Sequence, residues 1–263
     1  MSQRQPSLYI PHGGGPCFFM EDPSGTWVGM EAFLRNLAAL LPEAPKAILI
    51  VSGHWETDGF QFTAAPLPAL IFDYYGFPPH TYQLTYEASG DPALAERAAG
   101  LLHAAGYQAG IDAGRGIDHG VFVPLKVAFP RADVPIVEMS LDQGLDPVLA
   151  YRAGRTLRPL RDEGVLIIGA GMSFHNLRAY RNAQATEPSL AFDDWLAGVV
   201  EGDPAAREAG LADWAAAPAA RLAHPREEHL LPLMVAAGAS NAPGERVFGE
   251  LVMETMISGF RFA

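Results

Sequence analysis

Four short apolar runs recur along this chain, and each is typical of a strand that is buried on both faces of a sheet. The runs are Ser7–Ile10, Ala47–Ser52, Val134–Ser140 and Val165–Gly169. Most of them end at Gly, Ser or His, where a buried strand would meet a loop. Stretches typical of helices lie between them. Alternation of these two kinds of segment indicates an α/β fold.

The segments between the apolar runs predict helices. The predicted ranges are Thr26–Leu41, Asp91–Ala105, Pro147–Glu163 and Ser189–Gly202. Two of these helices start on an Asp-Pro pair, which places an N-cap residue directly before a proline at the first helical position. The Ala-rich segment 204–223 has few helix breakers, so it predicts surface helix with a turn at Pro218.

Weaker β-type segments predict the edges of the sheet. They are Phe60–Ala64, Gln108–Ile111 and Gly249–Ile257. We therefore expect a central mixed, mostly parallel sheet with helices on both faces. A length of 263 residues fits one large α/β domain or two small ones, and it is ample for a substantial core.

Charge and apolar content exclude several kinds of partner. The net charge is −12 with only 18 Lys and Arg residues, so we expect no nucleic-acid binding. No segment reaches the roughly 18 apolar residues needed to span a bilayer. The single cysteine, Cys17, cannot form an internal disulfide, and residues 1–6 lack the pattern of a signal peptide. A cytoplasmic location is therefore expected.

Five histidines lie in short segments rich in Gly, Pro or small residues: His12, His54, His119, His175 and His229. Three of them follow a predicted strand, and ligand crevices of α/β folds open at strand ends. Imidazole is both a metal ligand and an acid–base group near neutral pH. The pattern predicts a metal site with acid–base histidines beside it. Taken singly, each histidine also fits a turn or a half-buried ring bonded to a backbone carbonyl.

Other polar candidates carry weaker signals. Cys17 is interpreted as a small semi-buried residue rather than a nucleophile. His80, His103 and His224 show no comparable pattern, and His103 is expected on a helix surface. Glu227 and Glu228 precede an apolar helix predicted at Leu230–Ala237, where carboxylates are favoured by the helix dipole.

Together, the five histidine segments resemble class III extradiol ring-cleavage dioxygenases, most closely the DOPA 4,5-dioxygenase-like branch. Order and spacing both agree over nearly the whole chain, which implies one catalytic domain over residues 1–263. The motifs that carry the resemblance are Pro11-His12-Gly13-Gly14, Ser52-Gly53-His54-Trp55, Gly116-Ile117-Asp118-His119-Gly120, Phe174-His175-Asn176-Leu177-Arg178 and Glu228-His229-Leu230-Leu231-Pro232-Leu233.

The resemblance implies an enzyme that inserts both atoms of O2 into a catechol-type substrate, DOPA or a related catechol. It implies His12, His54 and His229 as ligands of a divalent metal, and it allows His175 as a fourth ligand. His119 and His175 match the family's acid–base histidines. Fe(II) is the metal expected for activity, although three neutral imidazoles suit Zn(II) as well. Glu228 is the alternative carboxylate ligand.

Two other classes of function fit the same residues. One is a zinc hydrolase that uses metal-bound water, and the other is a non-catalytic metal-binding or interaction protein on the same fold. The presence of both His119 and His175 favours an enzyme, because a binding protein needs no proton-transfer groups around a metal. Candidates for a pocket wall are the aromatic residues Tyr74, Phe77, Tyr82 and Phe122, and candidates for binding a substrate carboxylate are Arg115, Lys126 and Arg178.

Overall fold

The computed structural model describes residues 3–263 and is built on an eight-stranded sheet. The strand order is β5-β3-β7-β2-β8-β1-β10-β9. Parallel pairing joins β3 to β5, β7 to β2, and β8 to both β2 and β1, whereas the remaining pairs are antiparallel. The strands are β1 (Ser7–Pro11), β2 (Ala47–Thr57), β3 (Phe60–Thr63), β5 (Ala109–Asp112), β7 (Ile136–Asp142), β8 (Val165–Gly171), β9 (Gly244–Val252) and β10 (Thr255–Phe262).

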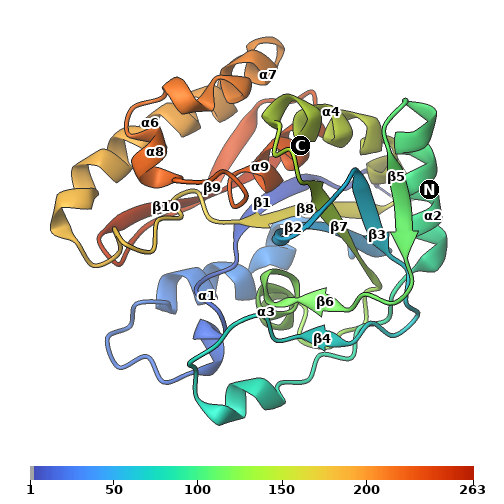
Figure 1. Ribbon diagram of the computed structural model, residues 1–263, viewed down its shortest axis with the longest axis horizontal. Helices are drawn as coiled ribbons and strands as arrows, with labels where there is room; N and C mark the ends of the chain where they lie inside the picture. Colours follow the sequence, from blue (N-terminus) through green and yellow to red (C-terminus); the bar gives the residue numbers. More distant parts are fainter. Residues whose placement is uncertain (1–2) are drawn as a thin grey trace.

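Helices cover both faces of this sheet, as Figure 1 shows. One face carries α1 (Val28–Arg35), α3 (His119–Ala128) and a two-stranded sheet of β4 (Leu70–Ile71) and β6 (Ile117–Asp118). The other face carries α2 (Pro92–Ala104), α4 (Pro147–Leu157), α6 (Thr186–Glu201) and α9 (Leu231–Gly238), with α5 (Pro159–Asp162), α7 (Pro204–Ala212) and α8 (Ala220–Ala223) nearby. The predicted α/β class is confirmed. Among residues 3–263 no helix is both long and apolar enough to cross a membrane.

The core lies in two layers, one on each face of the sheet. Along β2, Ile48 and Ile50 face the layer that contains α3, while Leu49 and Val51 face the layer that contains α4 and α9. All four side chains are fully buried. Alternate side chains of a strand point to opposite faces, so a strand covered on both sides needs an uninterrupted apolar run.

Proline and short 3-10 turns divide two of the predicted helices. The segment 147–163 forms α4 and α5, which meet at Arg158, because Pro159 has no backbone N–H to continue the hydrogen bonds of the helix. The segment 26–41 forms α1, which ends at Arg35, followed by a 3-10 turn at Leu37–Leu40.

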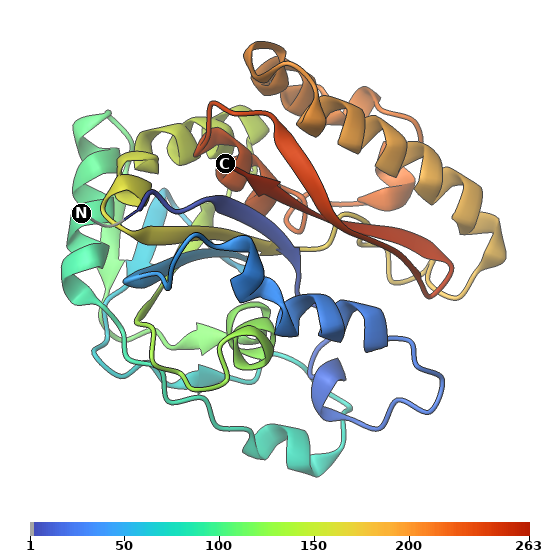
Figure 2. The same ribbon diagram turned by 180° about the vertical axis from the view of Figure 1, so that it is seen from behind.

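The prediction of one edge strand near the C-terminus was wrong. Residues 244–262 form the β9–β10 hairpin, which lies beside α6 in Figure 2. Its turn residues, Met253 and Glu254, have φ angles of 49° and 67°. Two-residue hairpins need positive φ at both positions and favour Asn and Gly there. Neither Asn nor Gly occurs at these two positions, so the local sequence does not predict a hairpin turn. At the other side of the sheet β5 is the edge, and β3 lies one strand inside.

Two buried arginines hold the C-terminal end of α9. The Arg161 side chain is fully buried and donates hydrogen bonds to the carbonyls of Gln5 (2.7 Å), Ala239 (2.7 Å) and Phe262 (3.2 Å). Arg207 donates to two further carbonyls near the same helix end, those of Ala237 and Ser240. The last carbonyls of a helix have no partner within the helix and carry partial negative charge. Burial lowers the pKa of Arg161 only to about 10, so it stays charged at neutral pH.

We expect Arg161→Met to lower the free energy of unfolding by about 3 kcal/mol or more, because each buried carbonyl left without a donor costs about 1–3 kcal/mol. Urea denaturation measures this change. Arg97→Met is the matched control, because Arg97 is exposed and its ion pair among residues 3–263 is with Glu163, an interaction worth about 1 kcal/mol at most. Equal losses in the two variants would contradict this role of Arg161.

Candidate metal centre

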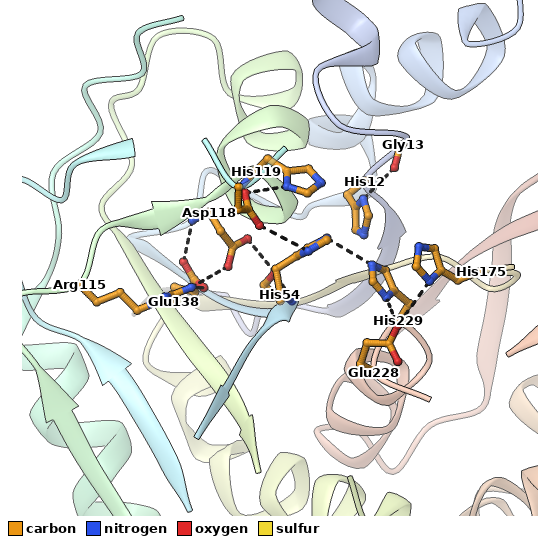
Figure 3. Close-up of polar contacts among 12 residues, drawn as sticks. His12, Gly13, His54, Arg115, Asp118, His119, Glu138, His175, Glu228 and His229 are labelled. Atoms are coloured by element: carbon orange, nitrogen blue, oxygen red, sulfur yellow. Dashed lines mark hydrogen bonds and ion pairs between the residues drawn. The ribbon is translucent and has the colours of Figure 1, made fainter. Parts of the chain in front are cut away.

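Three histidines from distant parts of the chain meet at one end of the sheet. His12 follows β1, His54 lies near the end of β2, and His229 lies in the turn before α9. One ring nitrogen of each lies within 4.8 Å of the other two, and the Nε2 atoms of His54 and His229 are 3.2 Å apart (Figure 3). The sequence placed His54 after its strand, but β2 continues to Thr57 with an irregular register between Val51 and Glu56.

Close backbone contacts fix the turn that carries His229. The His229 carbonyl accepts hydrogen bonds from the Tyr9 hydroxyl (2.9 Å) and the Met172 backbone N–H (3.2 Å). A Cβ atom on Gly171 would lie 2.2 Å from that carbonyl, and one on Gly53 would lie 2.8 Å from the carbonyl of Glu228. Gly53 within β2 and Gly171 at the end of β8 therefore allow the turn to lie directly against the sheet.

Acceptors at Nδ1 set the tautomers of the three rings. His12 Nδ1–H donates to the Gly13 carbonyl (2.9 Å), and His229 Nδ1–H donates to Glu228 Oε1 (2.9 Å). His54 Nδ1 lies 3.5 Å from Asp73 Oδ2. Each proton at Nδ1 leaves a lone pair on Nε2. The Nε2 atom of His12 is buried and has no hydrogen-bond partner among residues 3–263.

The electrostatics of the three rings fit a divalent metal ion. Burial, followed by the neighbouring histidines, lowers the pKa of His12 and His229 well below the ordinary value, and that of His54 to about 4. The rings are therefore neutral at pH 7, the state in which imidazole binds metals. Two nitrogens that each lie about 2.1 Å from one ion, at an angle of roughly 100°, are about 3.2 Å apart. The His54–His229 separation has this value.

His119 lies beside the three-histidine set. It is the first residue of α3, and both its backbone N–H and its Nδ1–H donate to Asp73 Oδ1, at 3.0 and 2.7 Å. Its ring centroid is 4.1 Å from that of His54. The short strand β6 directly precedes this helix.

His175 lies on the opposite side of the set, next to His229. The two rings are stacked, with centroids 3.4 Å apart and planes inclined by 18°. His175 Nδ1 is 3.5 Å from Glu228 Oε1, and these two residues form a separate potential ligand group with His229. The structure thus brings together all five histidines that the sequence singled out.

Two carboxylates at the site were missed or interpreted differently from sequence. Asp73 contacts His54 and His119, but it lies 46 residues before His119 and was not singled out from the sequence. Glu228 was considered as a helix-start acid or an alternative ligand. Its Oε1 atom instead faces the Nδ1 atoms of His229 and His175.

A buried acidic network supports the backbone at His54. Asp118 accepts hydrogen bonds from Ser52 Oγ (2.8 Å) and Arg115 Nη2 (3.0 Å), and Ser52 Oγ accepts the His54 backbone N–H (3.1 Å). Burial, followed by the charge of Asp118, raises the pKa of Glu138 well above its usual value. Arg115 lies between these carboxyl groups, which accounts for its positive charge without a substrate carboxylate.

Aromatic side chains lie beside His119. The Tyr74 ring is edge-on to that of His119, with centroids 5.6 Å apart, and it also contacts Phe77, Tyr82 and Phe122. The four aromatic candidates for a pocket wall therefore form one cluster. Cys17 is buried, and burial raises the pKa of its thiol, so it is not a thiolate at neutral pH.

Of the two other basic candidates for binding a substrate carboxylate, Lys126 donates from Nζ to the Thr85 carbonyl (2.7 Å). Arg178 is exposed and lines a cavity of about 490 Å³ together with His175. Among the remaining histidines, His224 is buried and its Nε2 bonds the Ser173 carbonyl at 2.9 Å. His103 is exposed on α2, as expected.

Comparison with known proteins gives matches over the whole of this site. Residues 8–259 match the family model described as the catalytic LigB subunit of aromatic ring-opening dioxygenase. The dioxygenase tasH of Hapsidospora irregularis is 39% identical, covering 90% of this chain and 78% of the relative. The 4,5-DOPA dioxygenase extradiol of Beta vulgaris is 35% identical, covering 96% of this chain and 92% of the relative.

A solved structure shows the same architecture. The crystal structure of the uncharacterised protein JW3007 from Escherichia coli K12 superposes with a TM-score of 0.77 at 28% identity, covering 99% of this chain and all of that one. The fold, the assembled histidines and the extent of the family match all indicate the same family. The chain belongs to the LigB family of aromatic ring-opening dioxygenases, the class III extradiol dioxygenases.

Proposed function

We propose that residues 1–263 form one catalytic domain that cleaves a catechol-type substrate with insertion of both atoms of O2. The observation that carries this proposal is the group of three imidazoles with one ring nitrogen of each within 4.8 Å of the others, and with two further histidines beside them. Relatives named 4,5-DOPA dioxygenase extradiol support DOPA or a related catechol as the substrate class. Family membership favours ring opening over hydrolysis at zinc and over a non-catalytic binding role.

We propose His12, His54 and His229 as the metal ligands and Fe(II) as the active metal. Zn(II) suits the same three imidazoles. A bound divalent metal would supply Lewis acidity to the two catechol hydroxyls, and iron would add redox chemistry with O2. Glu228 Oε1 is already occupied by His229 Nδ1–H, so Glu228 orients a ligand in this proposal. His175 remains a candidate fourth ligand, because it shares a potential ligand group with His229.

We propose that His119 and His175 carry the protons of the reaction. A catechol loses a proton when it binds as an anion, and a proton must return when the ring opens. Asp73 holds the proton on His119 Nδ1, which leaves Nε2 as a base. His175 is about one-fifth exposed and faces Glu228 through Nδ1. A carboxylate therefore holds one nitrogen of His119 firmly, whereas the contact between His175 and Glu228 is longer.

Ring cleavage is tested on metal-free protein that is reloaded anaerobically with Fe(II) or Zn(II). A panel of catechols is added with O2, and the yellow ring-fission product is followed together with oxygen uptake. We expect product with Fe(II) and little or none with Zn(II), because Zn(II) has no redox chemistry. Hydrolysis of esters or amides by the zinc form, without oxygen uptake, would favour the hydrolase alternative.

The ligand assignment is tested by the metal content of His12→Ala, His54→Ala and His229→Ala. Each variant removes one of three ligands, so we expect its affinity for Fe(II) or Zn(II) to fall by at least about 10-fold, the scale seen even when a partner of a ligand is lost. His103→Ala on α2 is the control and should keep wild-type metal content. A proposed ligand whose loss leaves the affinity unchanged would be removed from the set.

The acid–base role is tested with His119→Ala. This variant should keep its metal, because His119 lies outside the three-histidine set, and it should lose about 10²-fold or more in turnover. Metal content and kcat are measured on the same preparation. A folded variant that loses its metal would show that His119 is a ligand.

A further inference from the structure

Two carboxylates flank the histidine cluster, and each contacts two histidines. Asp73 lies 2.7 Å from His119 Nδ1 through Oδ1 and 3.5 Å from His54 Nδ1 through Oδ2. Glu228 lies 2.9 Å from His229 Nδ1 and 3.5 Å from His175 Nδ1, both through Oε1. Figure 3 shows His54 with His119 on one side of the cluster and His229 with His175 on the other. Each carboxylate thus joins one proposed metal ligand to one proposed acid–base histidine.

Each carboxylate makes one short and one long contact. The short contact of Asp73 is to a proposed acid–base histidine, whereas that of Glu228 is to a proposed metal ligand. Asp73 makes its short hydrogen bond to the proposed acid–base residue His119, which also donates its backbone N–H to the same oxygen. Glu228 makes its short hydrogen bond to the proposed ligand His229. Charge-assisted hydrogen bonds of about 2.7–2.9 Å are strong and directional, whereas a contact of 3.5 Å orients its partner weakly.

We propose that Asp73 and Glu228 are positioning residues that serve different functions. Asp73 orients His119 for proton transfer, and Glu228 orients His229 for metal binding. This inference rests on the proposed function, because it uses the roles assigned there to the histidines. A carboxylate at Nδ1 fixes both the tautomer and the rotation of an imidazole, so that Nε2 points where the chemistry needs it.

Hydrogen-bond donors surround both carboxylates. Asp73 Oδ1 accepts the backbone N–H and the Nδ1–H of His119, and Glu228 Oε1 accepts His229 Nδ1–H. Arg226 Nη1 lies 3.6 Å from Glu228 Oε2 and pairs with Glu56 of β2, which ties the His229 turn to the strand of His54.

The test compares Asp73→Asn with Glu228→Gln, which remove each charge and keep the size of the side chain. Three quantities are measured: the affinity for Zn(II) or Fe(II) by competition with a chelator and without substrate, kcat and KM at saturating metal, and Tm. For Asp73→Asn we expect metal affinity within about 3-fold of wild type, and kcat lowered about 10-fold or more with little change in KM. For Glu228→Gln we expect metal affinity about 10–100-fold weaker, and kcat largely recovered at saturating metal.

Matched controls come from helix α7 and its cap. Asp203→Asn keeps an N-cap acceptor for the Ala205 backbone N–H, and Glu208→Gln removes the charge of a half-buried partner of Arg152 and Arg155, far from the histidines in the sequence. Both controls should match wild type in affinity and kcat. Asp73→Glu, which keeps the charge, should recover part of the kcat that Asp73→Asn loses. A structural role alone would lower Tm in both Asp73 variants without this recovery.

The inference is overturned if the two variants lose the same quantity, if Asp73→Asn keeps wild-type kcat, or if Glu228→Gln keeps wild-type metal affinity. Failure of the proposed function gives a different result. In that case the wild-type protein itself binds no divalent metal or opens no catechol. A wild-type protein that does both, together with variants that fail to separate the two effects, refutes only the roles of Asp73 and Glu228.

Discussion

Lone-pair repulsion among three imidazoles, two buried and one half-buried, is the constraint on which the rest of this site depends. Nε2 of His54 and of His229 lie 3.2 Å apart, while the buried Nε2 of His12 has no partner among the described residues. This arrangement is unfavourable by itself, because the buried acceptor on His12 lacks a donor and the other two Nε2 atoms lie close together. The surrounding chain must therefore hold the rings in place. An oxygen atom lies near the Nδ1 atom of each ring. The contacts of His12 and His229 are short hydrogen bonds, and that of His54 is longer.

Helix α9 fixes the position of His229, because contacts hold the helix at both of its ends. At its C-terminal end, Arg161 and Arg207 donate to carbonyls that no helix can satisfy by itself. Before its N-terminal end, the Tyr9 hydroxyl together with Gly53 of β2 and Gly171 of β8 keeps the turn of His229 against the sheet. The helix cannot slide along the sheet without breaking contacts at one end, so the position of His229 is fixed from both directions.

Periodicity and local motifs predicted the sheet, the helix starts at Asp91 and Asp146, and the five histidines of the site. Both caps accept backbone N–H groups as expected. The rest depended on contacts between segments far apart in the chain. Asp73 acquires its place from the pairing of β4 with β6, and the turn at Met253–Glu254 forms against its local preference because both hairpin strands pack under α6. Arg115 was a candidate for substrate binding until the positions of Asp118 and Glu138 were known.

The central position of β1 has a consequence for how the site forms. This strand pairs with β8 on one side and with β10 on the other, so Ser7 lies opposite both Ile167 and Phe262. Loop-closure entropy opposes contacts between residues so far apart, and proteins dominated by them fold slowly. His12 leaves the ribosome early, yet its partner His229 follows more than two hundred residues later. The cluster of histidines is thus among the last features that a newly made chain can complete.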